Sequence, residues 1–228
     1  MKRWKDCPFE IWLSIDRKID TDFPYDNIVI SSSPKNLVRM RDVDFITPYV
    51  IMMQDDHWLI DDVNTDKILE CIEIAKKYNT GNLRLLQDPI AYDVFDTKLN
   101  LMEYKKGKAY RISARGGLWE TEYLKNYIAK FEDFWEMERL GQKYSCENDK
   151  LILCTKHRTL PIIDAVHKRK YTEFAYAMLD AAGLDYEREI MRCKDSLISD
   201  IKGTIIEINP ELITGIQSIL NIGHKQKY

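Results

Sequence analysis

The stretch that decides the fold is Tyr49 to Leu59, YVIMMQDDHWL. Its first five residues are all apolar, a pattern typical of a strand buried on both faces of a sheet. The apolar run ends abruptly at Gln54, so two adjacent carboxylates, Asp55 and Asp56, follow the strand. In open α/β sheets, ligands bind at the carboxyl ends of the strands. We therefore expect a ligand site at this turn.

Strand and helix patterns alternate on both sides of this stretch. Before it, Glu10–Ile15 and Asn27–Ser31 are short apolar runs typical of buried strands. After it, apolar residues at helical spacing predict a helix from Thr65, and Leu83–Leu86 is a further strand candidate. Strand, helix and strand at this spacing predict the α/β class, with a mainly parallel mixed sheet flanked by helices.

The second half of the chain is more mixed, and it contains no linker long enough to separate domains. We therefore expect a single domain over residues 1–228. The expected elements are a strand at Tyr110–Ser113, helices from Thr121 and Phe134, short strands at Ile152–Cys154 and Pro161–Val166, helices at Thr172–Ala182 and Asp185–Cys193, and a strand followed by a helix in Gly203–Tyr228.

The composition argues against nucleic-acid binding, a membrane-spanning helix and a secretion signal. The 34 Lys and Arg nearly balance the 37 Asp and Glu, whereas a nucleic-acid-binding protein normally needs a concentrated basic excess. The longest stretch without Asp, Glu, Lys or Arg, Leu212–His224, falls short of the about 20 apolar residues of a membrane-spanning helix. The amino terminus, MKRWKDCPFE, lacks the apolar run of a secretion signal. We expect a cytoplasmic protein that does not bind nucleic acid.

The carboxylate pair suggests a metal. Two carboxylates held at one point repel each other unless a cation or a proton lies between them. Mg²⁺ or Mn²⁺ held by one or two protein carboxylates keeps its other positions for water and a diphosphate. Asp is also common in turns, so the alternative interpretation is that Asp55 and Asp56 only form a turn.

A second acidic cluster lies in FEDFWEMERLG, residues 131–141, where Glu132, Asp133, Glu136 and Glu138 surround Trp135. On a helix, Glu132 and Glu136 share one face, and like charges at this spacing repel. Such crowding can raise the pKa of a carboxyl group toward the range of a general base. The alternative interpretation is a solvated acidic helix face.

The third motif is GGLW, residues 116–119. Paired glycines let a backbone approach a ligand closely, and an aromatic ring can cover the apolar face of a sugar. Alternatively, Gly116 and Gly117 form an ordinary turn and Trp119 belongs to the core.

The order of these motifs resembles the bacterial sugar transferases of the glycosyltransferase-A (GT-A) fold, particularly those of lipopolysaccharide and capsule synthesis in Gram-negative bacteria. The resemblance covers roughly residues 5–185, and the later motifs are also similar in layout to those of β-1,4-galactosyltransferases. It rests on CPFEIWL at Cys7, YVIMMQDDHWL at Tyr49, LRLLQDP at Leu83, YRISARGGLWETEYL at Tyr110 and WEMERLG at Trp135.

The resemblance implies a donor site in residues 1–100. Asp56, with Asp55, would hold Mn²⁺ or Mg²⁺ and through it the diphosphate of a nucleotide sugar. Gln54 stands where the family's motif has its first acid, so Asp55 is an alternative contact for the donor ribose or sugar. A later histidine often completes such a metal site, and the candidates are His167 and His157.

The resemblance also implies an acceptor half in residues 101–195, followed by a strand-helix extension in residues 196–228. Glu136 or Glu138 would act as the base on the acceptor hydroxyl, with Glu132 as a third candidate. Arg84, with Asp88, either contacts the nucleotide or forms a structural pair. The remaining substrate-binding candidates are Gly116, Gly117, Trp119 and Trp135. The basic segment 156–171 would meet the donor diphosphate or the anionic head group of a lipid-linked acceptor, or else is a solvated face.

Together these features predict an inverting, metal-dependent glycosyltransferase that acts on a saccharide or lipid-linked acceptor, with association at the inner face of a membrane. In the GT-A fold the first strand normally precedes the CPFEIWL segment by some tens of residues, whereas only the six residues MKRWKD do so here. We therefore expect the chain to lack the first β-α unit. The alternatives are a catalytically inactive relative that binds ligands or partners, and a metal-dependent phosphoryl-transfer enzyme or hydrolase.

Overall fold

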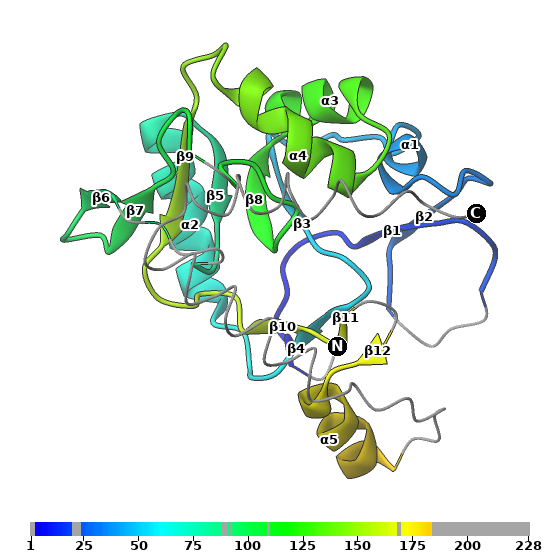
Figure 1. Ribbon diagram of the computed structural model, residues 1–228. Coiled ribbons are helices and arrows are strands. Elements are labelled where there is room, and N and C mark those ends of the chain that lie inside the picture. Colours follow the sequence, from blue (N-terminus) through cyan, green and yellow to red (C-terminus); the bar gives the residue numbers. More distant parts are fainter. Residues whose placement is uncertain are drawn as a thin grey trace, which may run out of the picture. The chain divides into compact units, whose positions relative to one another are not determined.

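The computed structural model of the chain describes residues 3–19, 24–87, 91, 93–108, 110–167 and 170–183 (Figure 1). The chain divides into two compact units, residues 1–163 and 164–228, and each is described by itself. The predictions for Asp88, Asp185–Cys193 and Gly203–Tyr228 lie outside the described residues. The expected single domain stays a prediction.

A mixed six-stranded sheet forms the centre of the first unit, in the order β3-β8-β5-β9-β7-β6. Among these strands only β5 and β9 pair in parallel. The expectation of a mainly parallel sheet was therefore wrong, because β8 inserts antiparallel between β3 and β5, and β6 and β7 add an antiparallel hairpin. The strands are β3 (Tyr49–Met52), β5 (Thr80–Arg84), β6 (Asp93–Asp96), β7 (Leu101–Glu103), β8 (Gly117–Glu120) and β9 (Leu151–Thr155).

The helices begin and end at local signals. In α2 (Thr65–Tyr78) the Asn64 side chain accepts a hydrogen bond from the Lys67 amide, a cap worth about 1 kcal/mol. The helix ends at Asn79, whose φ of 51° is left-handed. The predicted helix from Thr65 is confirmed. The other helices of this unit are α1 (Asn36–Met40), α3 (Thr121–Lys130) and α4 (Phe134–Ser145).

Helices cover both faces of the sheet. On one face, buried residues of α2 such as Ile68 pack with Leu118 and Leu153. On the other face, α1, α3 and α4 pack with the neighbouring residues Trp119 and Cys154. Adjacent strand residues thus belong to opposite layers, as the two-residue period of a strand requires. The first unit is an α/β structure with a mixed sheet flanked by helices.

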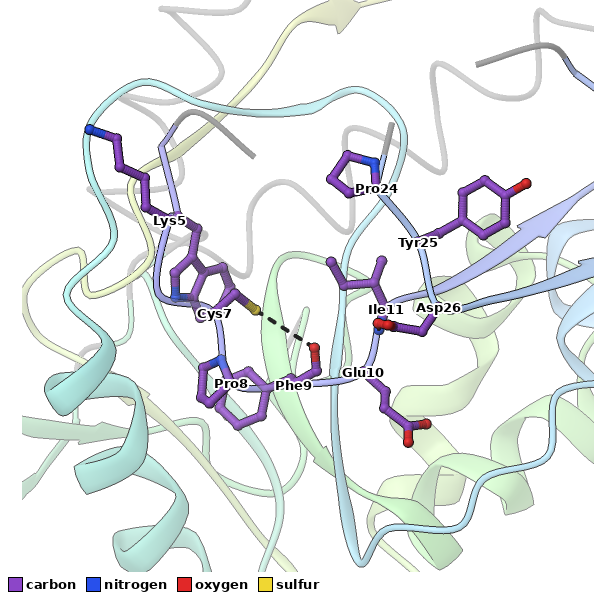
Figure 2. Close-up of a pocket in the computed structure, with 10 residues that line it drawn as sticks. Lys5, Cys7, Pro8, Phe9, Glu10, Ile11, Pro24, Tyr25 and Asp26 are labelled. Carbon is purple, nitrogen blue, oxygen red and sulfur yellow. Dashed lines mark hydrogen bonds between the residues drawn. The ribbon is translucent and has the colours of Figure 1, made fainter. Parts of the chain in front are cut away.

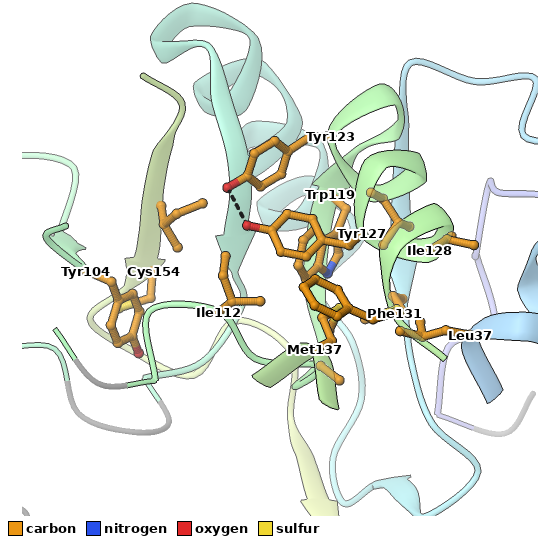
Figure 3. Close-up of a cluster of buried hydrophobic side chains, with 14 of the residues drawn as sticks. Leu37, Tyr104, Ile112, Trp119, Tyr123, Tyr127, Ile128, Phe131, Met137 and Cys154 are labelled. Atoms are coloured by element: carbon orange, nitrogen blue, oxygen red, sulfur yellow. Dashed lines mark hydrogen bonds between the residues drawn. The ribbon is translucent and has the colours of Figure 1, made fainter. Parts of the chain in front are cut away.

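An aromatic cluster fills the layer between β8 and helix α3 (Figure 3). Trp119 is fully buried, and its ring stacks on Tyr123 and meets Tyr127 edge-on. The hydroxyl oxygens of Tyr123 and Tyr127 lie 3.0 Å apart and share a hydrogen bond. Burial raises the pKa of both tyrosines, so both stay neutral at physiological pH.

Two small sheets accompany the large one. Strand β1 (Trp12–Ile15) pairs in parallel with β2 (Asn27–Ile30), and both contact α1. Strand β4 (His57–Leu59) pairs with β10 (Ile162–Asp164). Strand β4 was not expected, because three residues after a turn carry little periodic signal. The strands expected near β1 and β2 are confirmed.

In the second unit, strands β11 (Val166–His167) and β12 (Lys170–Tyr171) pair antiparallel and precede helix α5 (Glu173–Ala182). The Thr172 side chain accepts a hydrogen bond from the Ala175 amide, and Gly183 ends the helix with a φ of 66°. The predicted helix is confirmed at both ends. Within the described ranges, no helix combines the length and the apolar character needed to cross a membrane.

Candidate active site

The acidic pair lies in a tight turn at the carboxyl end of β3. The His57 amide donates to the Gln54 carbonyl at 3.0 Å, and the Gln54 amide donates to Nδ1 of His57 at 3.1 Å. Asp55, at the centre of the turn, is exposed and Asp56 is half-buried. The prediction of a turn is confirmed. Sequence reasoning missed His57, which is buried and closes the turn, although its position directly after two acids was a signal.

The segment Ser113–Gly116, which we call the Ser113 segment, lies against this turn. The side-chain amide of Gln54 donates to the Ala114 carbonyl at 3.4 Å. The Leu85 amide, just after β5, donates to the Gly116 carbonyl at 3.2 Å. Met52 of β3 pairs with Gly117, where β8 begins. The carboxyl ends of β3 and β5 therefore meet the Ser113 segment at one edge of the sheet.

Glu138 of α4 completes this group. Its Oε1 accepts two hydrogen bonds from the Ser113 segment, one from Ser113 Oγ at 2.8 Å and one from the Ala114 amide at 2.7 Å. Its Oε2 accepts no hydrogen bond from any residue that the structure describes. The half-buried carboxylate is thus held by one oxygen while the other stays available. A carboxylate held in this way has a fixed orientation and a second oxygen on which a proton could be accepted.

The other acids of the cluster serve the start of helix α4. Asp133 accepts a hydrogen bond from the Glu136 amide at 2.8 Å, and Glu136 accepts one from the Glu132 amide at 2.9 Å. Lys35 lies 2.8 Å from Asp133 and 4.0 Å from Glu132. The hydrogen bond from Lys35, followed by that from the Glu136 amide, lowers the pKa of Asp133. Of the three predicted base candidates, only Glu138 contacts the Ser113 segment.

The glycine pair is explained by packing. A Cβ atom at Gly116 would run into the side chain of Ile162, and one at Gly117 would crowd the side chain of Asn82 at 3.1 Å. Trp119 has no exposed surface on which a sugar could lie. The structure thus places Trp119 in the core, in line with the alternative interpretation, and we leave it out of the proposed site.

Arg84 and Trp135, both predicted to bind substrate, lie in opposite environments. Arg84 is fully buried in β5, and its guanidinium donates to the carbonyls of Tyr110 and Arg111 at 2.5 and 2.8 Å. Trp135 is 85% exposed in the first turn of α4, three residues before Glu138. Residues three apart share a helix face, so Trp135 remains a candidate platform for a sugar ring.

A basic segment follows β9 at the same edge of the sheet. Lys156, His157 and Arg158 are exposed. The amides of Thr159 and Leu160 then donate to the Leu85 carbonyl at 2.7 and 3.0 Å. The early part of the predicted basic segment is thus tied to the carboxyl end of β5. His167 belongs to β11 of the second unit, and its role as a metal ligand stays a prediction.

The Gln54 turn offers two adjacent carboxylates, one exposed at Asp55 and one half-buried at Asp56. Within the part of the chain that the structure describes, no three or more His, Cys, Asp or Glu side chains gather in an arrangement that could hold a metal. Asp55 and Asp56 would therefore supply one or two carboxylates from a single turn. Mg²⁺ commonly binds in this way, with phosphate oxygens and water in its other positions.

Two cavities lie outside this group. One, drawn in Figure 2, lies between residues 4–11 and 24–26, which lead into β1 and β2. Its volume is about 440 Å³. There Asp26 accepts a hydrogen bond from the Ile11 amide at 2.8 Å, and Cys7 Sγ donates to the Phe9 carbonyl. A second cavity of about 450 Å³, lined by residues 45–49 and 120–122, lies at the opposite end of β3 from the Gln54 turn. Neither cavity is lined by a predicted site residue.

The class that these observations define is an α/β protein with a mixed six-stranded sheet and a polar group at the carboxyl ends of β3 and β5. Comparison with protein-family models finds no match for the sequence, and comparisons with curated proteins and with solved structures find none either.

Proposed function

We propose that this protein is an inverting, metal-dependent glycosyltransferase of the GT-A fold. It would move a sugar from a nucleotide diphosphate sugar to a saccharide or lipid-linked acceptor in surface-polysaccharide synthesis. The observation that carries the proposal is the contact of Glu138, the Ser113 segment and the Gln54 turn at one edge of the sheet. Three motifs that lie far apart in the sequence meet there.

Glu138 is the proposed base. Inversion at an anomeric carbon needs a group that removes the proton of the acceptor hydroxyl, and a carboxylate with one free oxygen suits this task. The two hydrogen bonds to Oε1 fix the orientation of the carboxylate, which favours attack in a single direction. Glu132 and Glu136 stabilise the start of α4 and are not part of the proposed machinery.

Asp55 and Asp56 are the proposed metal ligands. A divalent cation bound there would neutralise negative charge on the diphosphate of the donor. Lys156 and Arg158, exposed after β9, supply positive charge near the carboxyl end of β5 and would attract the same diphosphate. Trp135 would offer its exposed ring to the apolar face of the acceptor sugar.

The test is ligand binding with and without metal. We expect uridine- or guanosine-diphosphate sugars to raise the melting temperature by about 2–4 °C with Mn²⁺ and by less than about 1 °C without it. Asp56→Asn should abolish the shift while keeping the fold. Asp44→Asn is the matched control, because Asp44 is an exposed acid outside the proposed site.

Three outcomes would contradict the proposal. Donor binding that is equally tight without metal would remove the role of Asp55 and Asp56. Absence of a shift with every nucleotide sugar would favour a non-catalytic relative. Cleavage of the donor diphosphate at the same rate with and without acceptor sugars would favour a hydrolase.

A further inference from the structure

Two arginines of the first unit are almost completely buried. Arg84 is 0% exposed and Arg111 is 2% exposed. A buried charge is costly unless hydrogen bonds replace its water. Arg111 donates to the carbonyls of Tyr104, Ser145 and Lys150 at 2.8, 2.7 and 3.1 Å. It thereby ties the chain near residue 111 to the end of α4 and to the start of β9.

Arg84 holds the same part of the chain, near residue 111. Its guanidinium donates to the carbonyls of Tyr110 and Arg111 and lies 3.9 Å from the centre of the Tyr104 ring. Tyr110 has a φ of 55°, a left-handed conformation that is unfavourable for a residue with a large side chain. Tyr110–Ser113 was expected to be a strand. Instead it is an irregular segment. Arg84 holds its carbonyls at Tyr110 and Arg111, and the Arg111 side chain ties it to carbonyls outside the segment.

The two residues whose carbonyls Arg84 holds, Tyr110 and Arg111, lead directly into the Ser113 segment, which contacts Glu138. Ile112, Ser113 and Ala114 are buried and follow Arg111 without a break. Ser113 and Ala114 then donate to Glu138. Arg84 holds the Arg111 carbonyl, and only one residue separates Arg111 from Ser113, whose hydroxyl orients the Glu138 carboxylate. A change in the position of this carbonyl would therefore move both donors.

We propose that Arg84 is a positioning residue that acts through the Ser113 segment to orient Glu138. In this role Arg84 binds no substrate, whereas the sequence left open whether it contacts the nucleotide or forms a structural pair with Asp88. A well-packed apolar residue often replaces a buried charge without loss of stability, so stability alone does not explain a guanidinium at this point. The hydrogen bonds do explain it, because one terminal nitrogen of the guanidinium, Nη2, donates to two successive carbonyls of the segment. The catalytic consequence rests on the proposed function, whereas the positioning of the segment does not.

The first measurement is independent of activity. In Arg84→Met, we expect the amides of Ala114 and Arg115 to exchange with solvent at least about 10-fold faster than in the wild type. Arg41→Met is the matched control, because Arg41 also donates to two backbone carbonyls, those of Ile128 and Phe131, but not in this segment. Unchanged exchange in Arg84→Met, or an equal rise in Arg41→Met, would overturn the proposal.

The second measurement uses sugar transfer. We expect Arg84→Met to lower kcat about 10- to 100-fold with little change in the donor KM, and Arg84→Lys to restore part of the loss. Combined with Glu138→Gln, Arg84→Met should have almost no additional effect, because both changes act on the same carboxylate. If the loss of kcat in the double variant equalled the product of the two single losses, the proposal would be overturned.

The proposal can still be tested if sugar transfer is absent or if Arg84→Met does not fold. If no variant, the wild type included, transfers sugar while exchange in Arg84→Met rises, the proposed function fails and the positioning of the segment stands. If Arg84→Met does not fold, Arg84→Lys carries the exchange test. The Lys side chain is shorter and cannot place its ammonium group where Nη2 of Arg84 lies, so we expect exchange at Ala114 to rise about 3-fold. Wild-type exchange in that variant would overturn the proposal.

Discussion

The first turn of helix α4 and the turn that follows it both carry carboxylates, and the two turns use them differently. In the first turn, Asp133 and Glu136 accept hydrogen bonds from amides of the helix start itself. Two residues after Glu136, at the start of the second turn, Glu138 accepts hydrogen bonds from Ser113 and Ala114, which lie 25 and 24 residues away in the sequence. Residues two apart on a helix point in nearly opposite directions, so an acidic stretch can serve a cap and a distant segment at once.

The largest expected difference between the two turns is catalytic. Glu138→Gln keeps the shape of the side chain and an oxygen that can accept from Ser113, but it removes the base. We expect kcat for sugar transfer to fall about 10²- to 10⁴-fold. Glu136→Gln, the matched control in the first turn, should change kcat less than about 3-fold. Equal losses in the two variants would contradict the distinction between the turns.

The next effect concerns the contact of Glu138 with its partner segment. Ser113 is buried, and its hydroxyl donates to a carboxylate, so Ser113→Ala removes a charge-assisted hydrogen bond. We expect the free energy of unfolding in urea to fall by about 1.5–3 kcal/mol. Ser33→Ala is the control, because the half-buried Ser33 accepts a hydrogen bond from the Lys35 amide and does not contact a carboxylate in the residues that the structure describes. An unchanged urea midpoint for Ser113→Ala would show that this contact is weak.

The cap of the first turn should have a smaller effect that depends on pH. Asp133→Ala removes the cap and should lower the free energy of unfolding by about 1 kcal/mol at pH 7. Asp133→Asn keeps a capping oxygen and loses the ion pair with Lys35, so its loss should be smaller.

The pH dependence follows from the lowered pKa of Asp133, whose main cause is the hydrogen bond from Lys35. Because this pKa is lower in the folded protein than the ordinary value of 3.8, the carboxylate contributes stability above about pH 4. That contribution is lost as the pH falls through the folded pKa. The stability difference between the wild type and Asp133→Ala should therefore shrink below pH 4 in urea denaturation. A constant difference from pH 7 to pH 2 would contradict this reasoning.

The smallest expected effect on stability is at Trp135. Because this side chain is 85% exposed, Trp135→Ala should change the free energy of unfolding by less than about 0.5 kcal/mol. If the ring supports the acceptor sugar, the acceptor KM should rise while the donor KM stays constant. A stability loss above about 1 kcal/mol would show that the ring packs on the protein, and an unchanged acceptor KM would remove Trp135 from the site.

Much of the local structure could be predicted from the sequence. The apolar run from Tyr49 predicted strand β3, and helical spacing from Thr65 and Thr172 predicted α2 and α5. Strand β8 was not predicted, although its last residues, Trp119 and Glu120, directly precede a predicted helix. The glycine pair obscured it, because glycines favour turns unless packing excludes a side chain, as Ile162 does at Gly116.

The candidate site was predictable in its motifs but not in the roles of its residues. Asp55 and Asp56 lie in a turn at the carboxyl end of a strand, as the sequence indicated. The strand was expected to be buried on both faces, whereas β3 is an edge strand whose first three residues are only half-buried. The choice among Glu132, Glu136 and Glu138 depended on the position of the Ser113 segment, which no local pattern reports. The sequence left open whether Arg84 contacts the nucleotide or forms a structural pair with Asp88. Its burial and its carbonyl partners, which the sequence does not report, show a structural contact.

The sequence by itself determined the α/β class, the ends of α2 and α5 and the turn after β3, because caps, turns and apolar spacing depend on residues within a few positions of one another. Only the tertiary structure decided the antiparallel place of β8 between β3 and β5, the burial of Trp119 and Arg84, and the attachment of Glu138 to the Ser113 segment. These features depend on contacts between residues that are distant in the sequence. Local patterns allow several arrangements of such residues, and packing together with buried hydrogen bonds selects one of them.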